Sequence, residues 1–305
     1  MIAKQHVRVV IEVNYGENNI FTMILKAPEI AKDAKAGQFV MVYLDEDRYL
    51  LPRPISLYDV DKAKGEITLV YAVAGSGTKI ISDWPVGHTV RVLGPLGNGF
   101  ELDGFKAGER VALVGGGIGV APLYLLAKEL RTRGVLLDVY LGFRSDMPRL
   151  TRCFEAFAQR ICVATEDGSC EATVSGEGGL EGTSKLPNHS SIIHTAVKGY
   201  VTDLLPASPA LHTPPTSTTT SQSAHSAIPP HPTYTSILTC GPIPMLKAVA
   251  RYAKTHSIPC QVSLEERMAC GLGACKACVV KTMVGYRLCC LNGPVFDSKE
   301  VNWDA

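Results

Sequence analysis

Four cysteines in the last part of the chain constrain its fold more than any other feature. Cys270, Cys275 and Cys278 follow the spacing C-x4-C-x2-C, and Cys290 lies twelve positions after the third of them. This spacing is typical of the thiolate ligands of a plant-type [2Fe-2S] cluster. The motif contains two glycines, and glycine permits the positive φ angles that a tight loop around a cluster needs. The pattern therefore predicts a metal-organised segment whose chemistry is one-electron transfer.

A structural zinc site is the alternative for the same cysteines. Four-cysteine zinc sites usually pair two C-x2-C units, whereas the first gap here is four residues long. The spacing therefore favours the iron–sulfur cluster. Cys289 is adjacent to Cys290, and two neighbouring side chains do not easily reach one metal. Either residue can be the fourth ligand by this reasoning, and the other is then a bystander.

Composition limits the class of protein. The chain has 305 residues, of which 46% are hydrophobic, and a formal net charge of +1. This length predicts two or three domains, and the balanced charge offers no basic field for nucleic acid. The first residues lack a signal-peptide core, and the apolar runs are too short to span a membrane. We therefore expect a cytoplasmic protein with reduced thiols.

Residues 1–102 have the pattern of a small antiparallel β-barrel. Runs rich in β-branched and aromatic residues, separated by Gly and Pro turns, occur at 6–13, 20–26, 38–44, 55–60, 66–73 and 89–93. Short strands at such regular spacing are typical of an all-β barrel.

Strands and helices alternate over residues 103–256, and this alternation predicts a doubly wound parallel sheet. Strands are expected at 110–114, 135–142, 161–165 and 236–239, and helices at 121–133, 150–160 and 244–255. Residues 257–305 are expected to form a small third domain around the cluster, because so short a segment needs its metal to fold.

Two segments interrupt the alternating region. Residues 171–195 are rich in Gly and Ser, and residues 206–233 are low in complexity and contain no charged residue other than histidine. Such segments bury too little apolar surface to offset the entropy of ordering them. We therefore expect two insertions without regular structure, separated by a short amphipathic piece of the domain at 197–205.

Two motifs in the barrel predict a flavin site. Arg53-Pro54-Ile55-Ser56 offers a guanidinium for a phosphate and a hydroxyl for a ring edge. After Val70-Tyr71-Ala72 comes Gly75-Ser-Gly77-Thr78, at the start of an expected helix, where free backbone N–H groups attract phosphate. Each motif alone is as readily a turn or a loop. Their succession within one barrel favours a flavin.

A second nucleotide site is predicted in the alternating region. Gly115-Gly116-Gly117-Ile118-Gly119 joins a strand to a helix, where glycines allow the backbone to approach a pyrophosphate, although a ligand-free turn is the alternative. Cys240-Gly241-Pro242 ends a later strand, and Cys240 either borders a nicotinamide or is a buried thiol. Arg144 favours a 2′-phosphate and Asp146 a free ribose hydroxyl, so NAD and NADP both remain open.

The order of these motifs resembles the ferredoxin–NADP reductase superfamily. Within it, the segment from Leu264 to Cys278 and the ending Cys290-Leu-Asn-Gly-Pro-Val-Phe296 look like the electron-transfer subunit of the NAD-linked (class 1B) dihydroorotate dehydrogenases. The resemblance covers the chain except for the two insertions. It implies that Cys290, and not Cys289, completes the cluster with the other three cysteines.

The resemblance also implies a function in pyrimidine (UMP) biosynthesis. A separate catalytic subunit with FMN would oxidise dihydroorotate, and electrons would pass through the [2Fe-2S] cluster and FAD of this chain to NAD+. The family assembles as a heterotetramer with two copies of each subunit. The residues implied to hold FAD are Arg53, Pro54, Ile55, Ser56, Val70, Tyr71, Ala72, Gly77 and Thr78, and those implied to border NAD are Gly115, Gly116, Gly117, Gly119, Cys240, Gly241 and Pro242.

Two other classes of function remain open on the sequence. One is a flavin and iron–sulfur subunit of a sulfide dehydrogenase, a bifurcating ferredoxin–NADP oxidoreductase or a soluble hydrogenase, which share this motif order. The other is a non-enzymatic metal-binding module, in which the three site motifs would all be idle. The partner subunit distinguishes the first class, and visible absorption by flavin and cluster distinguishes the second.

Overall fold

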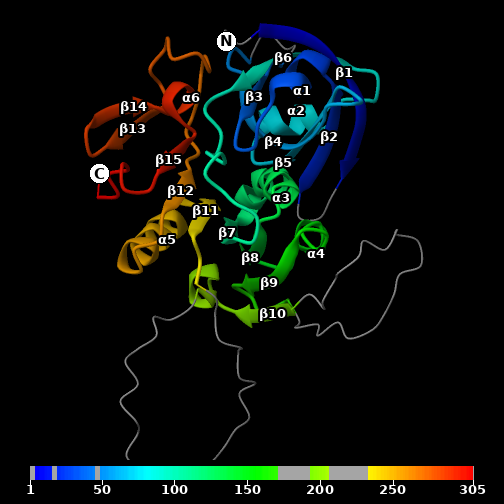
Figure 1. Ribbon diagram of the computed structural model, residues 1–305. Coiled ribbons are helices and arrows are strands. Elements are labelled where there is room, and N and C mark those ends of the chain that lie inside the picture. Colours follow the sequence, from blue (N-terminus) through cyan, green and yellow to red (C-terminus); the bar gives the residue numbers. More distant parts are fainter. Residues whose placement is uncertain (1–3, 16–18, 45–48, 171–192, 206–232, 305) are drawn as a thin grey trace, which may run out of the picture.

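The fold is described from a computed structural model (Figure 1), which defines residues 4–15, 19–44, 49–170, 193–205 and 233–304. A barrel formed by the first part of the chain lies above a sheet formed by the middle part, and the C-terminal segment lies beside both. No helix within these ranges is long and apolar enough to cross a membrane.

The first part of the chain forms a closed antiparallel barrel in the order β1-β2-β5-β4-β3-β6, as the sequence predicts. Its strands are β1 (Lys4–Tyr15), β2 (Ile20–Lys26), β3 (Phe39–Val42), β4 (Arg53–Asp61), β5 (Glu66–Ala72) and β6 (Thr89–Leu96), with helices α1 (Pro28–Asp33) and α2 (Ser76–Ser82) in the connections. Inward residues at alternate positions, such as Ile67 and Leu69, are fully buried, which is the period of a strand with one face in a core.

The middle part, with two strands from the C-terminal segment, forms the predicted parallel sheet. Its order is β10-β9-β8-β7-β11-β12-β15, and the edge strand β15 runs antiparallel to its neighbour. The strands are β7 (Arg110–Gly116), β8 (Leu136–Phe143), β9 (Ala158–Thr165), β10 (Ile193–Lys198), β11 (Ser236–Cys240), β12 (Cys260–Ser263) and β15 (Val295–Asp297). The helical elements are η1 (Gly117–Val120), α3 (Pro122–Thr132), α4 (Pro148–Arg152), η2 (Val201–Leu204) and α5 (Ile243–Thr255). The central strand β7 is buried along almost its whole length, as expected for a sheet covered on both faces.

The predicted helix at 150–160 is wrong over most of its length. Helix α4 ends at Arg152, and β9 already begins at Ala158. Phe154 and Phe157, whose spacing suggested a helical face, instead pack edge-on against the Tyr124 ring of α3 at centroid distances of 6.4 and 5.4 Å. Contacts with α3 therefore override the local helical pattern, and a series of tight turns carries the chain into β9.

The predicted C-terminal boundary of the first insertion, residue 195, is wrong by three residues. Residues 193–195 belong to β10, which pairs in parallel with β9 from Ile193 opposite Arg160 onward. The piece expected at 197–205 is part of the domain, because Val201, Leu204 and Leu205 are buried. Residues 171–192 and 206–232 lie outside the described residues, so the expectation of irregular structure there stays a prediction.

The C-terminal segment is tied to both other parts of the molecule. It contains the hairpin β13 (Val279–Thr282) and β14 (Gly285–Leu288), followed by the short helix α6 (Cys289–Asn292). Two strands that follow residue 256, β12 and β15, complete the seven-stranded sheet. The Asn98 amide of the barrel donates hydrogen bonds to the carbonyls of Leu291 and Asn292. The predicted boundary at residue 256 thus separates strands that share a sheet, and the domain limits stay a prediction.

Helix α3 fixes the sheet against the barrel. The rings of Tyr58 in β4 and Tyr124 in α3 stack with centroids 4.4 Å apart and planes 9° from parallel. One turn further along α3, the Lys128 ammonium lies 2.7 Å from the Asp59 carboxylate. Aromatic stacking and a half-exposed ion pair each contribute about 1 kcal/mol, and both join helix α3 of the sheet to strand β4 of the barrel.

A buried polar network closes the opposite end of the sheet. The Asp138 carboxylate in β8, which is fully buried, accepts hydrogen bonds from Arg110 at 2.9 Å and from the Tyr234 hydroxyl at 2.8 Å. The hydroxyls of Tyr234 and Tyr140 are 2.6 Å apart. Tyr234 lies two residues before the start of β11, so this network anchors the chain where it re-enters the sheet.

We expect Tyr234→Phe to destabilise the protein by about 1 to 3 kcal/mol, because it leaves the buried Asp138 carboxylate short of a donor. Urea denaturation followed by circular dichroism measures the change. Tyr200→Phe, which alters a tyrosine that is 65% exposed, is the matched control and should be neutral. Equal stability of the two variants would show that the network contributes nothing at this position.

Candidate functional site

A cavity of about 860 Å³ lies where the barrel, the sheet and the C-terminal segment meet. Its wall includes every residue predicted to hold FAD, from 53–56, 70–72 and 77–78. Ile118 of the glycine turn, Ala121 and Pro122 after it, and residues 263–268 at and beyond the end of β12 form the rest of the wall with a few neighbours. The structure therefore brings the two predicted barrel motifs together, and this volume is within the range of cofactor pockets.

Arg53 and Gly77 pack against each other at the start of α2. A Cβ on Gly77 would lie 2.3 Å from Arg53 Nε, so only glycine leaves room for the guanidinium there. The guanidinium also donates a 2.6 Å hydrogen bond to the carbonyl of Leu51. The Thr78 hydroxyl accepts hydrogen bonds from the backbone N–H groups of Ala74 and Gly75. A fixed guanidinium beside a glycine turn is suited to the phosphates of a dinucleotide.

Tyr71 supplies evidence of its own that the cavity fits a flavin. Its hydroxyl is buried and has no hydrogen-bond partner among the described residues, and burial raises its pKa well above the usual value. A buried hydroxyl without a partner costs about 1 to 3 kcal/mol. Because Tyr71 lines the cavity, a ligand with polar ring edges, such as an isoalloxazine, can satisfy this group.

The structure also brings the two motifs predicted to border NAD into contact. A Cβ on Gly119 would lie 2.6 Å from Gly241 Cα, and one on Gly116 would lie 2.9 Å from Pro242 Cδ. Gly117 has φ +55° and open space around it. Strands β7 and β11, which carry the two turns, lie side by side, and the chain leaves them in opposite directions across the sheet. Open α/β sheets bind ligands at such a switch point.

Cys240 is buried in the core. Its side chain is 1% exposed and does not line the cavity. Burial raises the pKa of its thiol, and the nearby Glu265 carboxylate raises it further. The described arrangement therefore makes Cys240 a neutral thiol behind the turn, while its backbone contacts Gly119. Its place next to a nicotinamide stays a prediction.

Among the residues of the cavity wall that the sequence analysis missed are those from Glu265 to Met268. They follow β12, a strand of only four residues that the sequence analysis did not predict. The Glu265 side chain is exposed and lines the cavity, and its loss of hydration beside the protein raises the pKa of its carboxyl. The missed signal is position: these residues leave the carboxyl end of a parallel strand, at the ligand-binding edge of the sheet.

The cluster cysteines lie in two pairs. Cys270 Sγ accepts a hydrogen bond from the backbone N–H of Cys275 at 3.4 Å. Cys278 Sγ accepts one from the backbone N–H of Cys290, also at 3.4 Å. No group of three or more metal-binding side chains among the described residues converges on a single ion. Two irons require two thiolates each, whereas one zinc requires all four together. The paired arrangement therefore fits the predicted [2Fe-2S] cluster better than zinc.

Electrostatics distinguish the cysteines further. Burial raises the pKa of Cys270, but hydrogen bonds from the backbone N–H groups of Cys275 and Leu272 outweigh it and lower the pKa to about 7. The thiolate, which is the form that binds iron, is therefore populated near neutral pH. Burial and the adjacent Cys278 raise the pKa of Cys290 to about 12. Cys289 is fully buried and points to the carbonyl of Leu264 at 3.4 Å.

Strand β3 connects the cluster loop to the cavity. Phe39 lines the cavity, and Met41 lies so close to Gly271 that a Cβ there would be 2.8 Å from Met41 Cγ. Residues two apart on a strand share one face, so the cavity and the loop lie along the same outer face of the barrel.

Comparisons with known proteins agree with this reading. The model of the "Oxidoreductase FAD-binding domain" matches residues 9–100, and that of the "Iron-sulfur cluster binding domain of dihydroorotate dehydrogenase B" matches residues 265–302. The solved structure of an NADH-dependent reduced ferredoxin-NADP oxidoreductase is similar with a TM-score of 0.73 and 25% identity, covering 98% of this chain and 91% of that one. A ferredoxin NADP+ reductase from Neisseria gonorrhoeae shares the fold, with a TM-score of 0.54, 18% identity, and coverage of 83% of this chain and 92% of that one.

The fold and the site thus define a flavin- and iron–sulfur-binding reductase of the ferredoxin–NADP reductase type. Proteins called "Dihydroorotate dehydrogenase B (NAD(+)), electron transfer subunit" match over nearly the whole chain. Those of a Geobacillus species (strain WCH70) and of Lysinibacillus sphaericus are each 36% identical, over 93% and 97% of both chains respectively. The chain belongs to the family of electron transfer subunits of dihydroorotate dehydrogenase B, which confirms the resemblance seen in the sequence.

We expect Gly77→Ala to weaken FAD binding by roughly tenfold or more, because the added Cβ displaces the Arg53 guanidinium from its place. Titration of the FAD-free protein with FAD, followed by flavin fluorescence, measures the affinity. Gly104→Ala is the control, since a Cβ there meets nothing within 4 Å. Unchanged affinity in Gly77→Ala would rule out Arg53 as a ligand of the flavin phosphates.

We expect Cys290→Ser to abolish or strongly weaken the cluster, whereas the adjacent Cys289→Ser should retain it. Cys290 lies against Cys278, while Cys289 points away toward Leu264. Visible absorption, and electron paramagnetic resonance after reduction, measure the cluster in both variants. Loss of the signal in Cys289→Ser with a normal signal in Cys290→Ser would reverse the assignment.

Proposed function

We propose that this chain transfers electrons from a dihydroorotate-oxidising catalytic subunit to NAD+. The observation that carries the proposal is that the cysteine loop and the flavin cavity lie along the same face of β3, at Met41 and Phe39. When bound, the cluster exchanges single electrons, and the flavin converts them to the two-electron hydride that nicotinamide requires. Family membership and the two matched domain models support the same function.

The residues of the chain have distinct parts in this function. Arg53 and the N–H groups around Gly77 would bind the FAD phosphates, and the Tyr71 hydroxyl would orient the ring system by a hydrogen bond. The Gly119–Gly241 contact would let the pyrophosphate of NAD approach the backbone closely. The Cys270–Cys275 and Cys278–Cys290 pairs would each hold one iron.

We propose NAD rather than NADP as the acceptor. The related subunits carry NAD(+) in their names. The Asp146 backbone N–H donates to the Ser169 hydroxyl at 2.7 Å, which fixes the loop after β8. Arg144 is exposed at this loop. With the loop held in this way, the Asp146 carboxylate would accept a hydrogen bond from the free ribose hydroxyl of NAD.

The partner would dock on an apolar patch around the cluster loop. We define this docking patch as Leu272 and Leu291, whose side chains are 50% and 56% exposed. Leu291 packs on the loop itself, because a Cβ on Gly273 would lie 3.2 Å from it. Exposed apolar groups of this kind mark protein interfaces. An FMN-containing partner and a heterotetramer with two copies of each subunit complete the proposal.

A second candidate function is that of a subunit of a bifurcating ferredoxin–NADP oxidoreductase. The similarity to the NADH-dependent reduced ferredoxin-NADP oxidoreductase structure, over 98% of this chain, favours it as the alternative. The two functions share the flavin and cluster sites and differ in the partner. Activity with each partner therefore separates them.

We expect dihydroorotate-dependent NAD+ reduction only when this chain is combined with the dihydroorotate dehydrogenase catalytic subunit from the same source. Leu272→Ser/Leu291→Ser should lower this coupled rate and leave NADH oxidation by an artificial dye unchanged. Val86→Ser, which alters an equally exposed residue of the barrel, should affect neither. NADH oxidation with dye but no coupling to dihydroorotate, together with turnover of ferredoxin, would favour the alternative.

A further inference from the structure

The loops that follow β8 and β9 are joined to each other at the carboxyl edge of the sheet. The backbone N–H of Asp167 donates to the carbonyl of Arg144 at 3.1 Å, beyond the end of both strands. Strand β8 pairs in parallel with β7, and Gly142 near its end lies opposite Gly116 of the glycine turn. The joined loops therefore begin beside the turn at which the pyrophosphate of NAD is proposed to bind.

The Ser169 hydroxyl links the two loops in both directions. It accepts a hydrogen bond from the Asp146 backbone N–H at 2.7 Å and donates one to the Asp167 carboxylate. That carboxylate also accepts the hydrogen bond of the Ser169 backbone N–H at 2.9 Å. These two hydrogen bonds, followed by one from the Ser145 side chain, lower the pKa of Asp167. Because the ionised carboxylate takes the hydroxyl proton of Ser169, a lone pair of that oxygen is left for Asp146.

Cys170 holds the carboxylate of Asp146 itself. Its thiol is hydrogen-bonded to this carboxylate, and its backbone N–H donates to the hydroxyl of the fully buried Thr165 at 3.3 Å. Partial burial, and then the charge of Asp146, raise the pKa of Cys170 to about 11. The thiol therefore keeps its proton at neutral pH and is the donor. A carboxylate has two acceptor oxygens, so Asp146 keeps acceptor capacity for a ligand.

Charged side chains of both signs lie at this edge. Arg144, Arg149 and Lys198 are exposed there, and so is Glu166. The arginines would suit the 2′-phosphate of NADP, because a guanidinium matches the geometry of a phosphate. A carboxylate accepts a hydrogen bond from a ribose hydroxyl and repels a phosphate in the same place. The exclusion of NADP would therefore depend on where the Asp146 carboxylate is held.

We infer that Ser169 and Cys170 are positioning residues that set the preference for NAD over NADP by holding Asp146 toward the ribose. The inference rests on the proposed NAD acceptor and names the residues that make the choice. Ser169 holds the backbone of Asp146, and Cys170 holds its carboxylate. A side chain held in this way gives up little rotamer freedom when the ribose binds.

The test compares NADH with NADPH as the electron donor to an artificial dye, using the FAD- and cluster-loaded chain alone. We expect the parent to have the higher kcat/KM with NADH. Ser169→Ala/Cys170→Val should lower this preference by roughly tenfold or more, through KM rather than kcat. Ser169→Thr/Cys170→Ser retains both hydrogen-bonding groups and should keep the preference. Flavin absorbance of each variant shows that it is folded and loaded.

A double-mutant cycle shows whether the two residues act through Asp146. Asp146→Asn should lower the preference by itself, and adding Ser169→Ala/Cys170→Val should then change it no further, because neighbouring groups that act as a unit are not additive. Calorimetric titration with adenosine 5′-monophosphate and adenosine 2′,5′-bisphosphate makes the same comparison without turnover. The Ser169→Ala/Cys170→Val variant should lose affinity for the first ligand relative to the second.

Three results would overturn the inference: an unchanged NADH preference in Ser169→Ala/Cys170→Val, an equal loss in Ser169→Thr/Cys170→Ser, or additive losses with Asp146→Asn. A parent that prefers NADPH would overturn NAD as the acceptor, and this inference with it. The dye assay needs no partner subunit, so a failure to couple to dihydroorotate is a separate result and leaves this test intact.

Discussion

The contact between α3 and β4 is the constraint on which the rest of the structure depends. The stacked Tyr58 and Tyr124 rings and the Lys128–Asp59 pair hold the sheet at one angle to the barrel. That angle places the carboxyl ends of β7 and β12 opposite the two barrel motifs, so that one cavity has walls from both. A rotation about this contact would open the cavity and separate the flavin motif from the glycine turn.

The C-terminal segment makes the cluster part of the same rigid unit. Strand β12 enters the sheet beside β11, residues 264–268 form the cavity wall, and β15 returns to pair with β12. The cysteine loop is therefore bounded by two strands of one sheet and packed on Met41 of the barrel. This arrangement explains how a segment too small to fold alone can hold four cysteines in two pairs.

The sequence predicted the parts of the site with local signals and missed those that depend on tertiary packing. Glycines at Gly77 and Gly119 are informative because each allows a close approach that a Cβ would block. Strand β12 was missed because four residues show no periodicity, and Glu265 was missed with it. The prediction of a helix at 150–160 was wrong over most of its length, because Phe154 and Phe157 pack on Tyr124 rather than along one helical face.

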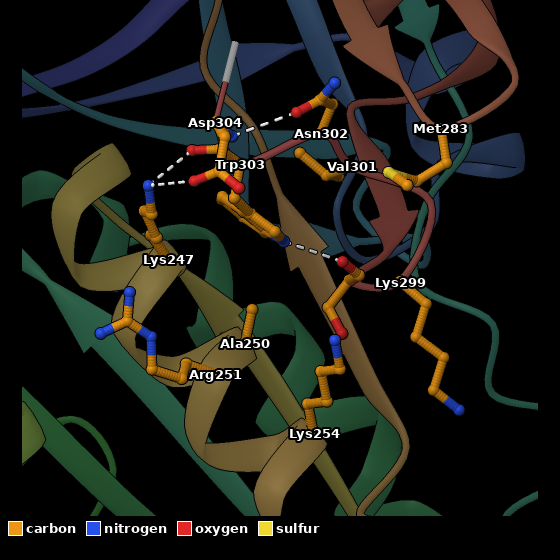
Figure 2. A pocket seen from close by; sticks show the side chains of 11 residues that line it. Lys247, Ala250, Arg251, Lys254, Met283, Lys299, Val301, Asn302, Trp303 and Asp304 are labelled. Carbon is orange, nitrogen blue, oxygen red and sulfur yellow. Dashed lines mark hydrogen bonds and ion pairs between the residues drawn. The ribbon is translucent and has the colours of Figure 1, made fainter.

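Helix α5 connects the glycine turn at 115–119 with a second cavity, of about 490 Å³, which residues of its later turns line (Figure 2). Met245 in its first turn lies against the backbone, because a Cβ on Gly116 would be 2.6 Å from Met245 Sδ. Lys254 in its last turn lines the cavity. A helix of 13 residues moves as one piece at this length, since its hydrogen bonds fix each turn to the next. Helix α5 therefore supports the glycine turn with its first turn and lines a second cavity with its last, although the two places share no residue.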